Sequence, residues 1–420
     1  MFKKNYLSKY LLTLLVNLFT FILTVIISIT LARKLGANSY GIYIIVINLS
    51  YFIGQFFFQG LYQTLYRQLN KIYNIKLEKL KVVVFIFLFF ILVLTLLLFL
   101  FHILINFSSI FNQSAWQFIS YFYYLLPIVV SWIFLRAIIN GLDKAYLVDL
   151  GEGLISKIFF LIFLIISFDY LTEELAIKTL IKVNSVTLII SFFITIFLIK
   201  SLFKYELIKN LKFKQSDLQN YINYIRKYTI SSILTFGLLD LGTVVIGFLS
   251  SADQVSSLSI ASRALFVVIM FQGVLNSTIL PQLRGLNFLN DKFKIKKLIN
   301  KIHIFFLILN FFVFLIVLFF GKIVIGILYG IEYIELVYPT AVVLFFSQFT
   351  LSTFLAFKPI LDFFGYEKIS INGLTLAFIF QLLLMFLLIP TYGALGFAIS
   401  TLCSNSILSL FVFIKSRKII

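Results

Sequence analysis

The apolar run IFFLILNFFVFLIVLFFGKIVIGIL, residues 304–328, decides the class of fold. A transmembrane helix needs about 20 consecutive apolar residues, and this run carries a single charge, Lys322. The run VVVFIFLFFILVLTLLLFLFHILI, residues 82–105, has the same character. The whole chain is 61% hydrophobic and 12% charged, whereas soluble domains have about 25% charged residues. We therefore expect an all-α polytopic membrane protein.

Applied to the whole chain, the same criterion predicts about twelve transmembrane helices joined by short loops. We place them at 10–32, 40–64, 82–105, 118–140, 150–168, 178–200, 228–250, 256–280, 303–328, 337–360, 370–389 and 394–415.

Charge asymmetry orients these spans. With the N-terminus in the cytoplasm, most of the 35 Lys and Arg residues fall on the cytoplasmic side, as the positive-inside rule requires. Both termini are then cytoplasmic. The net charge of +19 is explained by basic loops beside anionic lipid, and no nucleic-acid partner is needed.

The chain divides near its middle into two related halves. Residues 204–227 alternate lysines with apolar residues at helical spacing, which predicts an amphipathic linker on the cytoplasmic membrane surface. The linker separates a six-helix lobe over 1–203 from a second over 228–420. Phe-Gln-Gly occurs at 58–60 and again at 271–273, near the ends of spans two and eight. Six spans per half give a parallel repeat.

The sequence has few residues or motifs that would indicate a cofactor site or an enzyme. The single cysteine, Cys403, excludes an intramolecular disulfide and a cysteine metal cluster. His102 and His303 are far apart in sequence, so we expect interfacial positions rather than metal ligation. No ATP-binding Gly-x-x-x-x-Gly-Lys-Ser/Thr motif and no long outer loop for catalytic acids are present. We expect no cofactor, no metal and no enzymatic activity.

Five stretches together resemble the polysaccharide-biosynthesis (O-antigen, Wzx-type) flippase family of the multidrug/oligosaccharidyl-lipid/polysaccharide exporter superfamily. The resemblance covers nearly the whole chain, although residues 254–257, Gln-Val-Ser-Ser, depart from the Gly-Tyr-Tyr-like stretch usual there. The stretches are ARKLGANSYGIY (32–43), LDLGTVVIGFLSSADQVSSLSIASRA (239–264), ILPQLRGL (279–286), ILYGIEYIELVYP (327–339) and LLIPTYGALGFAISTL (387–402).

The resemblance implies a fold and a function. The fold would be two six-helix bundles forming a V around a central cavity. The function would be transfer of a polyprenyl-pyrophosphate-linked oligosaccharide from the inner to the outer leaflet of the bacterial cytoplasmic membrane. Membrane lipids would be partners, and a polysaccharide polymerase and glycosyltransferases would be functional neighbours. The alternatives are a cation-coupled multidrug-type antiporter of the same superfamily and a membrane glycosyltransferase or polymerase.

Such a substrate needs a polar path for its sugar and pyrophosphate. Asn48, Gln55, Gln59 and Gln63 fall within about 80° of arc on span two. In hydrocarbon their amides need partners. They form either a water-accessible surface that hydrogen-bonds sugar hydroxyls or polar contacts between helices.

Arg263 and Asp240 are the deepest opposite charges that we identify, and we treat Asp240 as the intramembrane acid. Their predicted depths differ by roughly 5 Å at 1.5 Å per residue. A buried charge needs a partner or water. The two residues form either a structural ion pair or a phosphate-binding arginine whose counterion, Asp240, is the ion-coupling candidate.

Other cations oppose the positive-inside trend or lie inside spans. Arg side chains suit bidentate phosphate contact, so we consider these cations as cavity residues, with lipid snorkelling as the alternative. They are Arg33, Lys34, Lys178 and Lys182 at the outer side and Lys157 in span five. For Arg136, at the cytoplasmic end of span four, we expect a membrane anchor.

Overall fold

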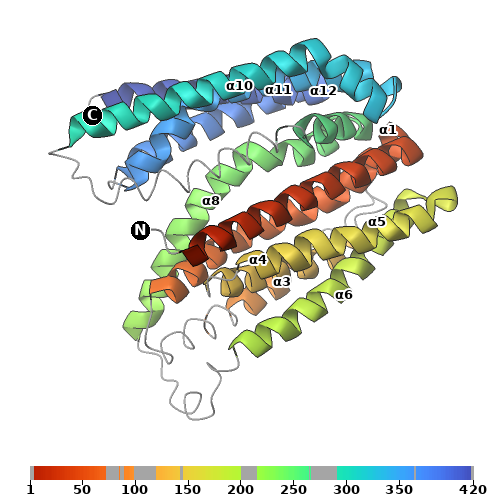
Figure 1. Ribbon diagram of the computed structural model, residues 1–420, viewed down its shortest axis with the longest axis horizontal. Helices are drawn as coiled ribbons and strands as arrows, with labels where there is room; N and C mark the ends of the chain where they lie inside the picture. The colour runs from red at the N-terminus through yellow and green to blue at the C-terminus, as the bar shows by residue number, and fades with distance from the viewer. Residues whose placement is uncertain are drawn as a thin grey trace. The chain divides into compact units, whose positions relative to one another are not determined.

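The structure is a computed structural model, and it describes residues 4–71, 85, 89–98, 120–141, 145–199, 215–263, 265, 291–363 and 366–417. In these ranges the regular secondary structure is helical (Figure 1). The prediction of an all-α polytopic membrane fold is therefore confirmed.

The first half contains three long helices and a short irregular passage. The long helices are α1 (Lys4–Lys71), α3 (Phe122–Gly141) and α6 (Glu173–Ile199). Between α3 and α6 lie α4 (Ala145–Val148), a π-helical turn η3 (Asp149–Ile155), α5 (Ser156–Ile166) and a 3₁₀ turn η4 (Phe168–Tyr170).

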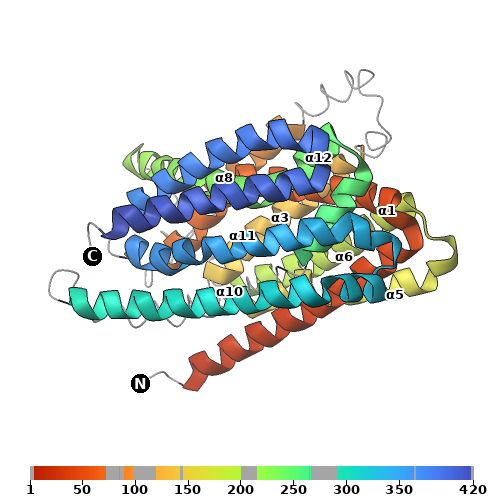
Figure 2. The same ribbon diagram turned by 90° about the horizontal axis from the view of Figure 1, so that it is seen from above.

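The second half begins with α8 (Gln215–Leu249), followed by a helix over 252–263. It continues with α10 (Lys292–Leu328), α11 (Glu332–Phe363) and α12 (Glu367–Arg417). The helices α10, α11 and α12 lie side by side in both views (Figures 1 and 2).

Two of the helices are too long for one membrane crossing, and glycine breaks them. The apolar stretch Leu15–Tyr66 has 52 residues, which would extend about 78 Å as a straight helix, against a hydrocarbon core of about 30 Å. Gly36 interrupts it with φ 77°, and Gly393 interrupts α12 with φ 54°. Only glycine adopts such values without strain. Each break separates two predicted spans.

The outer surface of the helices is apolar, as lipid contact requires. Six helices in the described ranges are long and apolar enough to cross a membrane. Large apolar side chains such as Phe197, Phe319 and Ile327 are strongly exposed. Exposed apolar surface of this extent is unfavourable in water and is stable against hydrocarbon tails.

Cα proximity divides the chain into two compact units. Unit 1 comprises residues 1–35 and 45–236, and unit 2 comprises 36–44 and 237–420. The lobes over 1–203 and 228–420 remain a prediction. Of the predicted linker 204–227, residues 204–214 lie outside the described part of the chain, and the remainder is helical and continuous with span seven in α8.

Polar side chains join the helices inside unit 2. The Asn310 side-chain amide of α10 donates to Ser352 Oγ (2.8 Å) and to the backbone carbonyl oxygen of Gln348 (3.1 Å), both in α11. The Gln381 amide of α12 donates to the Leu238 carbonyl oxygen (3.1 Å) and to Thr401 Oγ1 (3.2 Å). Such contacts hold helices together where hydrocarbon gives them no hydrophobic drive to associate.

Several stretches of the family resemblance meet in one cluster of turns in unit 2. Gly41 lies so close to the turn at Ala252 that a Cβ at position 41 would overlap the Ala252 carbonyl oxygen. Tyr40 and Tyr333 are fully buried near one another.

Gln254 belongs to the same cluster of turns. Its Oε1 accepts a hydrogen bond of 3.0 Å from the backbone N–H of Ala394, beside the break at Gly393. The unusual residue 254 therefore caps the helix that restarts after Gly393.

Some sequence predictions lie wholly or partly outside the described residues. These are most of the span 82–105 with His102, the span 256–280 beyond residue 265, the second Phe-Gln-Gly at 271–273, and the side chain of Asp240.

We predict that Gly41→Ala destabilises the protein by about 1–3 kcal/mol, because the added methyl group has only backbone to displace. The measurement is the thermal unfolding midpoint in detergent micelles. Lys297→Gln, at an exposed position of α10, is the control and should leave the midpoint unchanged. An unaltered midpoint for Gly41→Ala would contradict the close approach of these two turns.

Candidate functional site: a charged network in unit 1

The predicted amide stripe lies on the second arm of α1, and the structure leaves all four of its residues half-buried. Asn48, Gln55, Gln59 and Gln63 share this intermediate exposure. The Gln55 Oε1 atom is buried and has no hydrogen-bond partner among the described residues. A buried amide oxygen without a donor is costly. This helix face therefore has unused hydrogen-bonding capacity.

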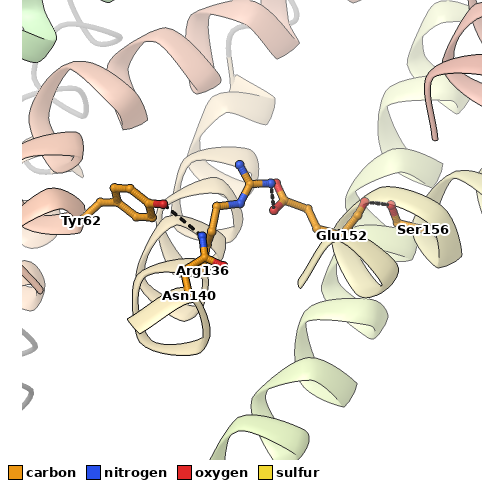
Figure 3. A network of polar contacts seen from close by, with 5 residues as sticks. All are labelled: Tyr62, Arg136, Asn140, Glu152 and Ser156. Atoms are coloured by element: carbon orange, nitrogen blue, oxygen red, sulfur yellow. Dashed lines mark hydrogen bonds and ion pairs between the residues drawn. The ribbon is translucent and has the colours of Figure 1, made fainter. Parts of the chain in front are cut away.

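Two tyrosines widen the stripe. Tyr51 and Tyr62 occupy helical positions beside Gln55. With them, the polar face covers about 120° around the helix, from Tyr51 on one side to Gln63 on the other. Tyr51 is an electrostatic neighbour of both Arg136 and Glu152. The Tyr62 hydroxyl accepts a hydrogen bond of 3.0 Å from the Asn140 amide of α3 (Figure 3). The stripe is thereby tied to the neighbouring helix of unit 1.

Helix α3 places Arg136 beside this polar face of α1. Arg136 and Asn140 are four residues apart and therefore share one side of the helix. Figure 3 shows the Arg136 side chain between the Tyr62–Asn140 hydrogen bond and Glu152. Arg136 Nη2 lies 2.7 Å from Glu152 Oε2. Arg136 is thus part of an ion pair within the bundle, which the expectation of a simple membrane anchor did not include.

The ion pair is asymmetric in exposure and in geometry. The Arg136 side chain is 43% exposed and that of Glu152 is 14% exposed. One nitrogen–oxygen contact joins the pair, and Arg136 Nε is buried without a partner among the described residues. Glu152 therefore does not occupy the planar fork of the guanidinium in the bidentate manner that this group allows.

The π-helical turn η3 places the acidic residues. Ser156 Oγ donates to the carbonyl oxygen of Glu152 (Figure 3), so the backbone of the widened turn has an additional partner. Gly151 and Gly153 let the turn pack closely, because a Cβ at these positions would press on Ser191 of α6 and Thr20 of α1. π-helical turns inside helices are frequent at functional sites.

A second carboxylate adds to the network. Asp149 lies in electrostatic range of Arg136 and Glu152, with Asn17 of α1 beside it. One guanidinium and two ionised carboxylates have a formal charge of −1. The expectation that Asp240 is the one acid within the spans is therefore incomplete, since Glu152 lies half-buried inside the bundle of unit 1.

The predicted outer cations are not gathered into this network by any described contact. Lys178 forms an ion pair of 2.7 Å with Glu174 one turn away on α6, and both side chains are 51% exposed. Exposed pairs of this kind contribute about 0–1 kcal/mol. Lys182 is exposed on the same helix. Lys34 Nζ lies 4.9 Å from the centre of the Phe168 ring.

The other predicted site residues are placed less completely. Arg33 is exposed, and Lys157, directly after Ser156, is half-buried; both take part in interactions with neighbouring groups. Arg263 is half-buried at the end of the helix 252–263. Its ion pair with Asp240 stays a prediction, because the Asp240 side chain lies outside the described part of the structure. His303 contacts Thr353 at 3.0 Å, and the described residues hold no cluster of three metal-binding side chains.

Arg136, Asn140, Glu152 and Asp149 are the residues that the sequence analysis missed as a site. Two signals were available. Arg136 and Asn140 have i, i+4 spacing, and the segment DLGEGL (149–154) puts two acids and two glycines at the start of a predicted span. Of these residues, only Arg136 entered the sequence prediction, as a membrane anchor.

Comparisons with known proteins identify the fold. No protein-family model matches the chain, and no curated protein matches it. Among solved structures, the chain is similar to lipid II flippase MurJ in an inward closed conformation, with TM-score 0.73, 16% identity, and coverage of 97% of this chain and 87% of that one.

Two transporters are also similar. An inward-facing multidrug resistance MATE family transporter of the MOP superfamily gives TM-score 0.66 and 14% identity, with 97% of this chain and 94% of that chain covered. The Vibrio cholerae MATE transporter VcmN in its bent form gives 0.55 and 16%, with 98% and 97% covered. The chain shares the fold of these transporters.

We predict that cysteines at Asn48 and Gln59, in a Cys403→Ser background, react with a hydrophilic, membrane-impermeant thiol reagent. The polar face of α1 should admit water because its amides have unused hydrogen-bonding capacity. The measurement is labelling in lipid vesicles. A cysteine at Phe197, 77% exposed on the apolar surface of α6, is the lipid-facing control. Protection of both α1 positions in every transport condition would assign this face to dry helix packing.

Proposed function

We propose that the chain is a flippase for a polyprenyl-pyrophosphate-linked oligosaccharide, working by alternating access. The observation that carries the proposal is a polar, charged network built into unit 1 of a fold similar to that of a lipid II flippase. A lipid-linked sugar has an apolar tail, an anionic diphosphate and a hydroxyl-rich headgroup. The protein offers chemistry suited to each of these parts.

Each part of the substrate has a matching surface. Strongly exposed apolar side chains on α6 and α10 can accompany the tail in the bilayer. The amide stripe on α1 can exchange hydrogen bonds with sugar hydroxyls, and Gln55 has an acceptor that is still unused. Arg136 and the predicted cavity residue Arg263 supply guanidinium groups for the diphosphate.

Location and partners belong to the same proposal. The charge asymmetry favours the bacterial cytoplasmic membrane with both termini in the cytoplasm. Transport would proceed from the cytoplasmic to the outer leaflet and would supply a polysaccharide polymerase with units made by glycosyltransferases. A surface polysaccharide of the O-antigen or capsule type is the product that we propose from the sequence resemblance. Arg33, Lys34, Lys157, Lys178 and Lys182 are the further cationic residues proposed to meet the headgroup.

One observation favours the rival function of a cation-coupled antiporter. The network of unit 1 contains two carboxylates, Glu152 and Asp149, for one arginine. A negative network would suit a cationic substrate or a coupling cation. The flippase remains the better-supported proposal because the amide stripe and the sequence motifs are typical of proteins that handle an uncharged sugar and an anionic phosphate.

We predict that Arg263→Ala reduces translocation of a fluorescent lipid-linked oligosaccharide at least about ten-fold, as the loss of a charged hydrogen bond would. The measurement is appearance of the headgroup at the opposite leaflet of reconstituted vesicles, with membrane insertion checked in parallel. Lys322→Ala, an exposed cation of α10, is the control. Full transport by Arg263→Ala would remove this residue from the mechanism.

The rival makes a different prediction in the same vesicles. An antiporter should expel a cationic dye when a proton or sodium gradient is imposed, and Glu152→Gln should abolish this activity. We expect gradient-driven dye transport to be absent from the wild type. Dye transport without transfer of the lipid-linked sugar would overturn the flippase proposal.

A further inference from the structure

We propose that Arg136 is the residue of unit 1 that receives the substrate diphosphate, and that Glu152 is its resting counterion, displaced when the diphosphate binds. The inference rests on the proposed function and assigns the anion-binding step to one ion pair. It concerns residues for which the sequence predicted at most a membrane anchor.

Geometry is the first argument. Glu152 meets the guanidinium through one 2.7 Å contact at Nη2, while Nε is unpartnered among the described residues. A guanidinium has five N–H donors arranged as a planar fork, and phosphate oxygens can engage two of them in parallel. A diphosphate can therefore form a contact with Arg136 that Glu152 does not form.

Accessibility is the second argument. The Arg136 side chain is 43% exposed, whereas the Glu152 side chain is 14% exposed. Part of the Arg136 side chain is therefore accessible, although its Nε atom is buried.

Charge balance is the third argument, and it requires displacement rather than addition. Glu152 already neutralises Arg136, and Asp149 adds negative potential nearby. A diphosphate that joined the intact pair would meet a network with a formal charge of −1. Exchange of partners leaves that formal charge unchanged, so the displaced Glu152 must take up a proton or water when Arg136 pairs with the phosphate.

The surroundings supply the fourth argument. Asn140, one turn from Arg136, has a buried Oδ1 without a described partner while its amide nitrogen binds Tyr62 (Figure 3). Gln55 has another such oxygen. In a low-dielectric interior, a polar network with unsatisfied groups gains stability when those groups acquire hydrogen-bond partners. These acceptors suit hydroxyl donors of the sugar that follows the diphosphate.

The test measures binding of farnesyl diphosphate to the purified full chain in lipid nanodiscs, with farnesol and inorganic pyrophosphate as the comparison probes. Farnesyl diphosphate should bind more tightly than either. Equal binding of farnesol would overturn the role of the diphosphate. Equal binding of pyrophosphate would assign the site to free phosphate compounds rather than to a lipid headgroup, and would equally overturn the inference.

The variants separate counterion exchange from a structural ion pair. Glu152→Gln should tighten binding about ten-fold, because no carboxylate competes for the guanidinium. Arg136→Gln should weaken it about ten-fold or more, and Arg136→Lys should also weaken it, because an ammonium lacks the fork. Asp291→Asn, which removes the carboxylate paired with Lys294 at 2.7 Å at the start of α10, is the matched control and should leave affinity unchanged.

Unchanged or weaker binding by Glu152→Gln would overturn the inference, because a merely structural pair predicts that result. If Arg136→Gln does not fold, Arg136→Lys and Glu152→Gln decide the question. The proposed function fails separately. Vesicles that do not transfer the lipid-linked oligosaccharide would reject the flippase, even if the diphosphate binds as described.

Discussion

The structure depends on one constraint: a polar group inside hydrocarbon must find a partner within the protein. Helices satisfy their own backbone, so the remaining question is where the side-chain partners come from. In unit 2 they come from amides and hydroxyls, as between Asn310 and Ser352. In unit 1 they include charges, and Arg136 and Glu152 bring opposite charges from two different elements into contact. Amides, hydroxyls and charges therefore all serve as partners inside the described helices.

The same constraint explains why the break at Gly393 is capped. At Gly393 the chain leaves helical geometry, and the freed N–H of Ala394 is taken up by Gln254 from another turn of unit 2. Gly36 has no heavy atom near the position of a Cβ, so it is needed for its backbone angle, whereas Gly41 is needed because Ala252 is so close. One motif therefore contains two glycines with different physical roles.

The sequence predicted the fold well because its signal was strong and local. Runs such as 304–328 have one stable arrangement in a bilayer, and helix α10 covers that run. The amide stripe was also predictable, since helical periodicity alone places Asn48 and Gln59 on one face. The ion pair was not, because nothing in a single sequence states that residues 136 and 152 face one another. The π-helical turn made this harder, since it shifts the helical register that a periodicity argument assumes.

The position of the charges also bears on how the empty protein is stable. A lone arginine in a bundle would be expensive, so a residue meant to bind an anionic substrate needs a substitute for that substrate when the site is empty. A carboxylate serves this purpose only if its hold is weaker than that of the ligand. The single contact between Glu152 and Arg136, with Nε unpartnered in the described structure, meets that condition. A fully bidentate pair would stabilise the empty bundle more and would leave the arginine less able to exchange partners. Because the pairing is incomplete, Glu152 can stabilise Arg136 in the empty bundle and still give way to an anionic substrate.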